Sequence, residues 1–239
     1  MTGTIKLFER YNSNPTFVET GTLEGHGVRS AIFAGYKTIH SIELADKYYE
    51  YSKDYFKYQD YVHIHKGDSR EALKGIIDNI TTPITFWLDA HYSGGDTAFK
   101  DVLYPILQEL DVIATHPIKT HTILIDDLRL MSKDFPAVGF GVEEIKKKLL
   151  EINLEYSFSL ADGHVDKDIL VAEVTAQKSF NIVVFSKDRA CQLDLFLRSF
   201  YEYVKDADKY LITVLYKTTN RYFEAGYTML KDTRRRCVS

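Results

Sequence analysis

The chain has 239 residues, 45% of them hydrophobic, which is enough to bury a sizeable core. Its 34 acidic and 30 basic residues are interspersed and give a net charge of -4, so no cationic face for nucleic acid is indicated. Two cysteines, Cys191 and Cys237, exclude a disulfide framework, and no apolar run is long enough to span a membrane. We therefore expect a cytoplasmic protein without a nucleic-acid or membrane partner.

Strand-like and helix-like segments alternate along the first part of the chain. Alternation of this kind predicts a parallel sheet with helices on both faces. Apolar, β-branched runs predict strands at residues 17–19, 38–43, 62–65, 84–89 and 122–125. The intervening periodicity predicts helices at residues 27–34, 47–58, 69–79 and 97–114, and a further helix at 142–152.

Two more strands are expected at residues 156–160 and 169–174. The link between them holds the turn pair Asp162-Gly163 and is too short for a helical crossover, so these strands should be antiparallel neighbours. The pattern then restarts with a strand at 181–185, a helix at 191–203 and a strand at 210–216.

This pattern predicts two domains. The first, residues 1–176, would be a doubly wound, mostly parallel Rossmann-like sheet of seven strands with an antiparallel last strand. The second, residues 177–239, would be a small α/β segment.

A glycine-rich turn follows the first predicted strand, whose last residue is Glu19. The turn contains Gly21, Thr22 and Gly25 and leads into a helix. Glycines let a backbone approach a ligand closely, and a helix N-terminus favours negative groups. Glu43 ends the second strand, where an acid can accept both hydroxyls of a ribose. A nucleoside site is one interpretation. The alternatives are a tight turn without a ligand and, for Glu43, an acid at the N-terminus of the following helix.

Further acids follow the third, fourth and fifth strands. Asp68 is placed to accept from an adenine amino group, and Ser69 to cap the next helix. Asp89, Asp126 and Asp127 leave neighbouring strands at one sheet edge, where clustered carboxylates suit Mg²⁺. The alternative is that Asp126 or Asp127 merely caps a loop.

His91 lies two residues past Asp89, on the same side of an extended segment. A neutral imidazole at this position could take a proton from a substrate hydroxyl. A purely structural histidine is the alternative.

Four motifs in this order resemble those of class I S-adenosylmethionine-dependent methyltransferases, and most of all the metal-dependent sugar O-methyltransferases of the macrocin type. They are V-E-T-G at 18–21, G-D-S at 67–69, L-D-x-x-Y at 88–92 and I-D-D at 125–127. The resemblance covers about residues 15–175. In that group the residue two past the first metal ligand is typically an aspartate proposed as the base, and this chain has His91 there.

The resemblance also implies a role for each site residue. The turn would contact the methionine part of the cofactor, Glu43 would hold the ribose, and Asp68 and Ser69 would face the adenine. Asp89 would contribute to the cofactor site and, with His91, to catalysis. The residues expected in the turn are Glu19, Gly21, Thr22 and Gly25, and those expected to bind Mg²⁺ are Asp89, Asp126 and Asp127.

The segment from Asn181 onward resembles the opening of an A-type glycosyltransferase domain, on the run V-V-F-S-K-D-R at 183–189. The resemblance implies that Ser186 and Asp188 lie near a nucleotide. The D-x-D metal motif of that family would belong to a later strand, so this piece by itself is expected to be a partial domain.

Together these motifs predict an S-adenosylmethionine-dependent, Mg²⁺-assisted O-methyltransferase that acts on a sugar or glycan hydroxyl, or on another small-molecule acceptor. The main alternative is a catalytically inactive methyltransferase-fold module that docks a glycosyltransferase in glycan assembly. A nucleotide-sugar epimerase is disfavoured, because its G-x-x-G-x-x-G turn and Y-x-x-x-K pair are absent. The sequence leaves open whether the chain forms a homodimer or associates with a glycosyltransferase.

Overall fold

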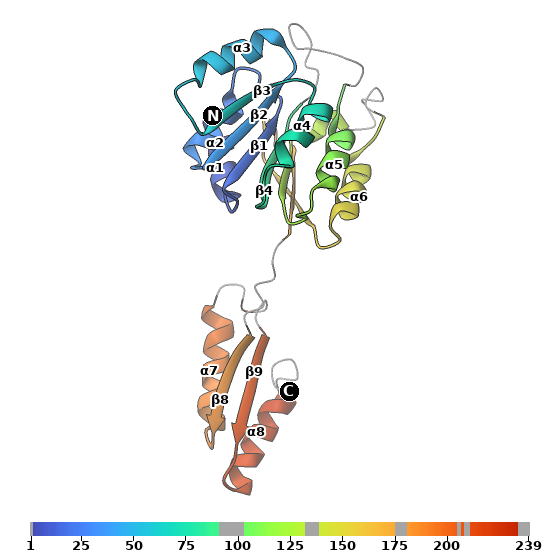
Figure 1. Ribbon diagram of the computed structural model, residues 1–239. Coiled ribbons are helices and arrows are strands. Elements are labelled where there is room, and N and C mark those ends of the chain that lie inside the picture. Colours follow the sequence, from blue (N-terminus) through green and yellow to red (C-terminus); the bar gives the residue numbers. More distant parts are fainter. Residues whose placement is uncertain are drawn as a thin grey trace. The chain divides into compact units, whose positions relative to one another are not determined.

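The computed structural model describes residues 2–90, 103–131, 139–174, 181–204, 207 and 211–233 (Figure 1). The chain divides into two compact units, Met1–Thr175 and Ala176–Ser239, which we call unit 1 and unit 2. None of the described helices is both long and apolar enough to cross a membrane.

A seven-stranded sheet forms the centre of unit 1, with the strand order β3-β2-β1-β4-β5-β7-β6. The first five strands along the chain run parallel, and β7 pairs antiparallel with both β5 and β6. The predicted mostly parallel sheet with an antiparallel end is therefore confirmed. The strands are β1 Thr16–Thr20, β2 Thr38–Glu43, β3 Val62–Lys66, β4 Ile84–Leu88, β5 Thr122–Ile125, β6 Ser157–Ala161 and β7 Ile169–Glu173.

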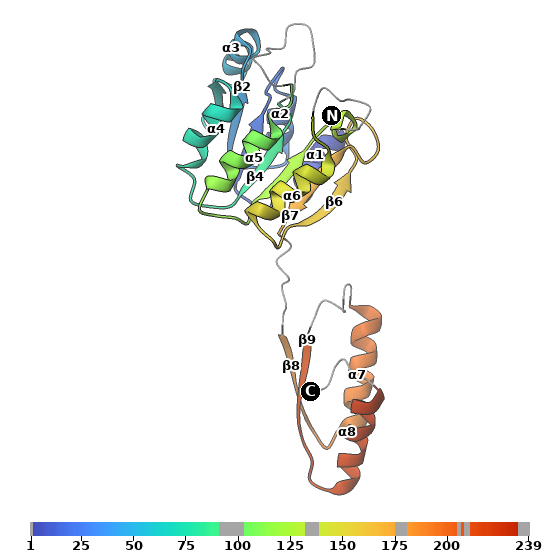
Figure 2. The ribbon, with the colours of Figure 1, turned by 90° about the vertical axis from the view of Figure 1, so that its right-hand side faces the viewer.

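Helices cover both faces of this sheet. Figure 2 shows α4, α5 and α6 side by side on one face, while α1, α2 and α3 lie on the other (Figures 1 and 2). No helix was expected at the position of α1. The helices are α1 Thr2–Arg10, α2 His26–Phe33, α3 Asp46–Tyr55, α4 Ser69–Ile77, α5 Ile106–Thr115 and α6 Val142–Ile152, with a short 3₁₀ helix, η1, at Leu128–Met131.

Side-chain alternation along the central strands supplies both cores. In β1, Phe17 packs in the core beneath α1 and α2, and Val18 packs in the core beneath α4, α5 and α6. In β4, Trp87 packs in the core beneath α1 and α2, and Phe86 packs in the core beneath α4, α5 and α6. Thr20 lies two residues after Val18 in β1. Its side chain therefore points to the same face of the sheet as Val18, the face that α4 and α5 cover.

Two local expectations were wrong. Residues 97–102 of the helix expected at 97–114 lie outside the described residues. The described helix begins only at Ile106, because Leu103–Pro105 is not helical and proline disfavours helical backbone in the residue before it. The cap of α4 is Asp68 rather than Ser69, since the Asp68 carboxylate accepts the backbone N–H of Arg70.

Unit 2 contains a two-stranded parallel sheet of β8 Asn181–Lys187 and β9 Leu211–Lys217. Helix α7 Ala190–Tyr203 and helix α8 Arg221–Thr233 accompany it. A small buried cluster holds these elements together and consists of Leu193, Leu197, Ile212, Val214, Tyr227 and Leu230. The two strands and α7 were expected from the sequence, and α8 was not.

Candidate cofactor site at the carboxyl edge of the sheet

The turn after β1 lies directly against the residue that follows β4. Gly21 has a φ of 87°, and a Cβ added to it would lie 2.6 Å from the backbone oxygen of Asp89. Gly25 has a φ of 71°, and its Cβ would lie 2.6 Å from the ring of Phe56. Only glycine fits both positions, so the turn is shaped by close backbone approach. The carboxyl ends of β1 and β4 are thereby brought together.

Glu19 supports this turn from beneath. It is only 1% exposed, and its carboxylate accepts a 2.5 Å hydrogen bond from Ser41, whose hydroxyl lies 2.6 Å from that of Thr22. Gly27 leaves room for it, because a Cβ there would lie 1.7 Å from Glu19 Oε1. Burial, with the nearby charges of Asp89 and Glu43, raises the pKa of Glu19 well above its usual value.

Glu43 joins the end of β2 to the same turn. Its Oε2 accepts the backbone N–H of Leu23 at 2.8 Å, and its Oε1 accepts that of Ala45 at 2.7 Å. Each carboxylate oxygen has a second lone pair. The two backbone N–H groups thus fix the orientation of the Glu43 carboxylate. Each of its oxygens can still accept one further hydrogen bond, for example from a hydroxyl group.

Asp68 lies at the end of β3 as expected, but it is already engaged. Besides capping α4, it binds the Arg70 side chain through Nε at 2.9 Å and Nη2 at 2.6 Å. An adenine amino group would therefore share Asp68 with this guanidinium. Ser69 follows as the first residue of α4 and is buried.

A carboxylate cluster lies at the ends of β5 and β7. One oxygen each of Asp126, Asp127 and Asp168 lies within 4.8 Å of the others. Arg129 forms ion pairs with both Asp127 and Asp168. Burial, followed by the charges of Asp89 and Asp127, raises the pKa of Asp126 to about 7. Asp89 is thus close enough to affect Asp126 but is not one of these three.

Two residues of this edge were missed by the sequence analysis. Asp168 directly precedes β7, and the antiparallel pairing of β7 with β5 returns it to the edge where Asp126 and Asp127 lie. Glu109 lies on α5 about one helical turn from both Ile106 and Ile113. Its position on the apolar face of the helix could have predicted from the sequence that this acid is buried.

Glu109 is fully buried, and neither of its oxygens nor Thr20 Oγ1 has a hydrogen-bond partner among the described residues. Burial raises its pKa from 4.5 to about 7. The hydroxyls of Ser69 and Thr20 oppose that rise, although neither completes a hydrogen bond, and the charges of Asp68 and Asp89 add to it. Its carboxyl group therefore lies at the floor of the same edge.

His91, the expected base, lies outside the described residues. In unit 2, the carboxylate of Asp188 accepts the N–H of Thr219 at 2.7 Å and its hydroxyl at 2.9 Å. Ser186 is hydrogen-bonded to Tyr227. Both side chains therefore connect β8 to segments beyond β9, and their expected place near a nucleotide stays a prediction.

No known protein family and no curated protein matches the sequence. Solved methyltransferase structures share its fold. PaMTH1 from Podospora anserina, bound to S-adenosylhomocysteine (SAH), is 15% identical with a TM-score of 0.52, over 71% of this chain and 75% of that one. An O-methyltransferase from Bacillus cereus, also with SAH, is 15% identical with a TM-score of 0.53, over 72% and 80%.

TomG from Streptomyces achromogenes, an O-methyltransferase in complex with S-adenosylmethionine, is 16% identical with a TM-score of 0.51, over 73% of this chain and 80% of that one. At these identities the similarity establishes the fold. Unit 1 has the α/β Rossmann-like methyltransferase fold that the sequence predicted.

Proposed function

We propose that unit 1 binds S-adenosylmethionine and transfers its methyl group to a hydroxyl of an acceptor molecule. The observation that carries this proposal is the meeting of Glu19, Glu43, Asp68 and Asp89 at one edge of a methyltransferase-type sheet. In open α/β sheets, ligands bind at this edge, outside the carboxyl ends of the strands.

The donor groups of the cofactor match these acids. The oriented oxygens of Glu43 suit two ribose hydroxyls, and Asp68 suits an exocyclic amino group. A sulfonium is positively charged, and Asp89 contributes negative potential beside the glycine turn. The absence of a side chain at Gly21 lets this turn pack against the Asp89 backbone, which holds the two carboxyl ends together.

The chemistry requires alignment and removal of a proton. A methyl group on a sulfonium is already activated, so the chain mainly has to place the acceptor oxygen in line with it. We assign proton removal to His91, because it occupies the position at which the resembled group typically has the aspartate proposed as the base, and a neutral imidazole can accept a proton.

A divalent cation also belongs to the proposal. Oxygen ligands from Asp126, Asp127 and Asp168 suit Mg²⁺, which lowers the pKa of a coordinated hydroxyl. A cation would relieve the repulsion between Asp126 and the neighbouring carboxylates. Arg129 now supplies part of that counter-charge, so a cation bound by all three acids would displace its ion pairs.

Two finer parts of the proposal rest on the motif resemblance alone. They are a sugar or glycan as the acceptor, and a glycosyltransferase-like role for residues 177–239.

Titration calorimetry of the full chain with SAH, together with mass spectrometry for co-purified SAH, tests the cofactor assignment. We expect Glu43→Gln to weaken SAH binding about tenfold or more, because hydrogen bonds to a charged acceptor contribute roughly 1.5–3 kcal/mol. Glu50→Gln, on the exposed side of α3, is the matched control. Absence of SAH binding by the wild-type chain, or equal binding by both variants, would reject the proposal.

A further inference from the structure

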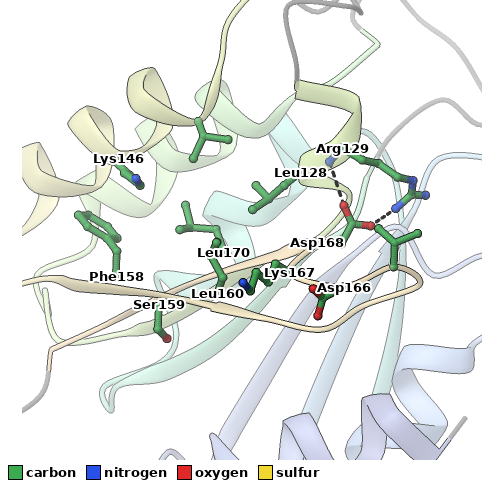
Figure 3. Close-up of a pocket in the computed structure, with 12 residues that line it drawn as sticks. Leu128, Arg129, Lys146, Phe158, Ser159, Leu160, Asp166, Lys167, Asp168 and Leu170 are labelled. Carbon is green, nitrogen blue, oxygen red and sulfur yellow. Dashed lines mark hydrogen bonds and ion pairs between the residues drawn. The ribbon is translucent and has the colours of Figure 1, made fainter.

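A cavity of about 420 Å³ opens beside the carboxylate cluster of unit 1 (Figure 3). Its volume falls in the range of roughly 300–1,000 Å³ that is typical of small-molecule pockets. It lies between η1, α6 and the β6–β7 hairpin. The walls are largely apolar and come from Leu128, Val142, Phe158, Leu160, Val165 and Leu170.

One end of the cavity adjoins the proposed reaction site. Asp168 and Arg129 line it, and Asp168 belongs to the cluster with Asp126 and Asp127. Figure 3 shows the Arg129 guanidinium paired with Asp168 at this end. A molecule that fills the cavity would therefore have one end beside the carboxylates.

The mouth of the cavity exposes apolar side chains to solvent. Leu160 in β6 is 51% exposed, and Val165, in the turn that joins β6 to β7, is 43% exposed. Apolar side chains that gather at the rim of a cavity are typical of binding grooves. They would be covered by the apolar part of a bound molecule.

Two lysines add positive charge to this apolar cavity. Lys167 extends along the hairpin toward Leu160 (Figure 3), and it forms no ion pair with any other described residue. Lys146 pairs with Glu143 at 2.8 Å, but Glu143 has an 82% exposed side chain, so water weakens this pair. Asp162 and Asp166, on the same turn, interact with Lys167 and partly offset this positive charge.

We propose that this cavity is the acceptor subsite, and that the acceptor is a hydroxyl-bearing molecule with an apolar ring system and one anionic group. The proposal rests on the proposed function, because the carboxylate cluster is where the reacting hydroxyl would lie. This acceptor differs from the sugar that the motif resemblance alone suggests. A free sugar fits less well, because its hydroxyls would lose water where they meet the apolar side chains of Leu128, Phe158 and Leu160.

The test uses 6-hydroxy-2-naphthoate, a fluorescent molecule with a hydroxyl, an apolar ring system and a carboxylate. Its binding to the full chain is followed by fluorescence anisotropy without metal or cofactor. The comparison ligands are 2-naphthol, which lacks the carboxylate, and methyl glucoside, which lacks the apolar rings and is measured by competition. We expect the naphthoate to bind most tightly and the glucoside not to compete.

Variants then assign this binding to the cavity. We expect Leu160→Asp and Val165→Asp each to weaken naphthoate binding about tenfold, since a carboxylate at the rim repels the anion and opposes apolar burial. Lys167→Glu should weaken the naphthoate more than 2-naphthol. The matched control is Leu154→Asp, at an 86% exposed position that does not line the cavity.

The outcomes separate this proposal from the proposed function. Naphthoate binding that is absent, or unchanged in both rim variants, overturns the acceptor subsite even if SAH binds normally. Competition by methyl glucoside at equal strength overturns the apolar acceptor. Cavity-dependent naphthoate binding without any SAH binding keeps the cavity as a ligand site and rejects the methyltransferase. Urea titrations of each rim variant, followed by the fluorescence of the buried Trp87, confirm that the fold is intact.

Discussion

Glu109 provides a quantitative test of the packing at the carboxyl edge. Its carboxyl group is fully buried, and its pKa is raised from 4.5 to about 7 by burial. The free energy that corresponds to this difference is about 3 kcal/mol. Below about pH 4.5 the group is neutral in both the folded and the unfolded chain, and its contribution to stability is fully present. As pH rises from 4.5 toward 7, the unfolded chain ionises before the folded chain, so this contribution decreases and is lost once the pH has passed about 7.

Replacing Glu109 with glutamine keeps the shape of the neutral acid and removes its ionisation. We expect the stability difference in favour of Glu109→Gln to be small near pH 5 and to grow by about 2–3 kcal/mol between pH 5 and pH 8. Glu19 and Asp126 also have raised pKa values, but they are present in both proteins and cancel in the difference.

Trp87 makes the measurement specific to unit 1. It is the only tryptophan of the chain and is buried in β4, so its fluorescence in urea titrations reports the unfolding of this unit. Glu9→Gln, on the exposed side of α1, is the control and should give a pH profile parallel to that of the wild type. Parallel profiles for Glu109→Gln and the wild type would refute the reasoning.

Three further predictions concern the site. Gly21→Ala should lower the free energy of unfolding by about 2–3 kcal/mol and abolish SAH binding, because its Cβ meets the Asp89 backbone and its φ is 87°. Gly75→Ala, which meets nothing within 4 Å in α4, should instead be neutral or stabilising, and urea titrations compare the two. Mg²⁺ affinity, measured by calorimetry, should rise about tenfold per pH unit below pH 7 as Asp126 deprotonates, and Asp126→Asn should remove that dependence. Arg129→Gln should strengthen Mg²⁺ binding, since it frees Asp127 and Asp168; weaker binding would show that Arg129 orients the ligands instead.

Much of the architecture follows from local patterns in the sequence. Apolar β-branched runs such as residues 38–43 form strands, because their side chains fit a buried pleated surface. The short link around Gly163 forced β6 and β7 to pair antiparallel. Glycines at positions 21 and 25 indicated a turn with close backbone approach, and both have positive φ. These features depend on neighbours along the chain, so periodicity and turn chemistry are sufficient to predict them.

Only the tertiary structure decided which acids meet. Asp168 joins Asp126 because an antiparallel strand is inserted beside β5, and Glu109 reaches the floor of the edge because α5 packs against α4. The sequence could not show that Asp68 is held by Arg70, or that Glu19 lies under Gly27, because both depend on side-chain directions in the folded chain. The cavity beside Asp168 likewise has walls from four separate elements. Contacts between distant segments arise from packing in three dimensions, and a local sequence pattern does not encode their distances.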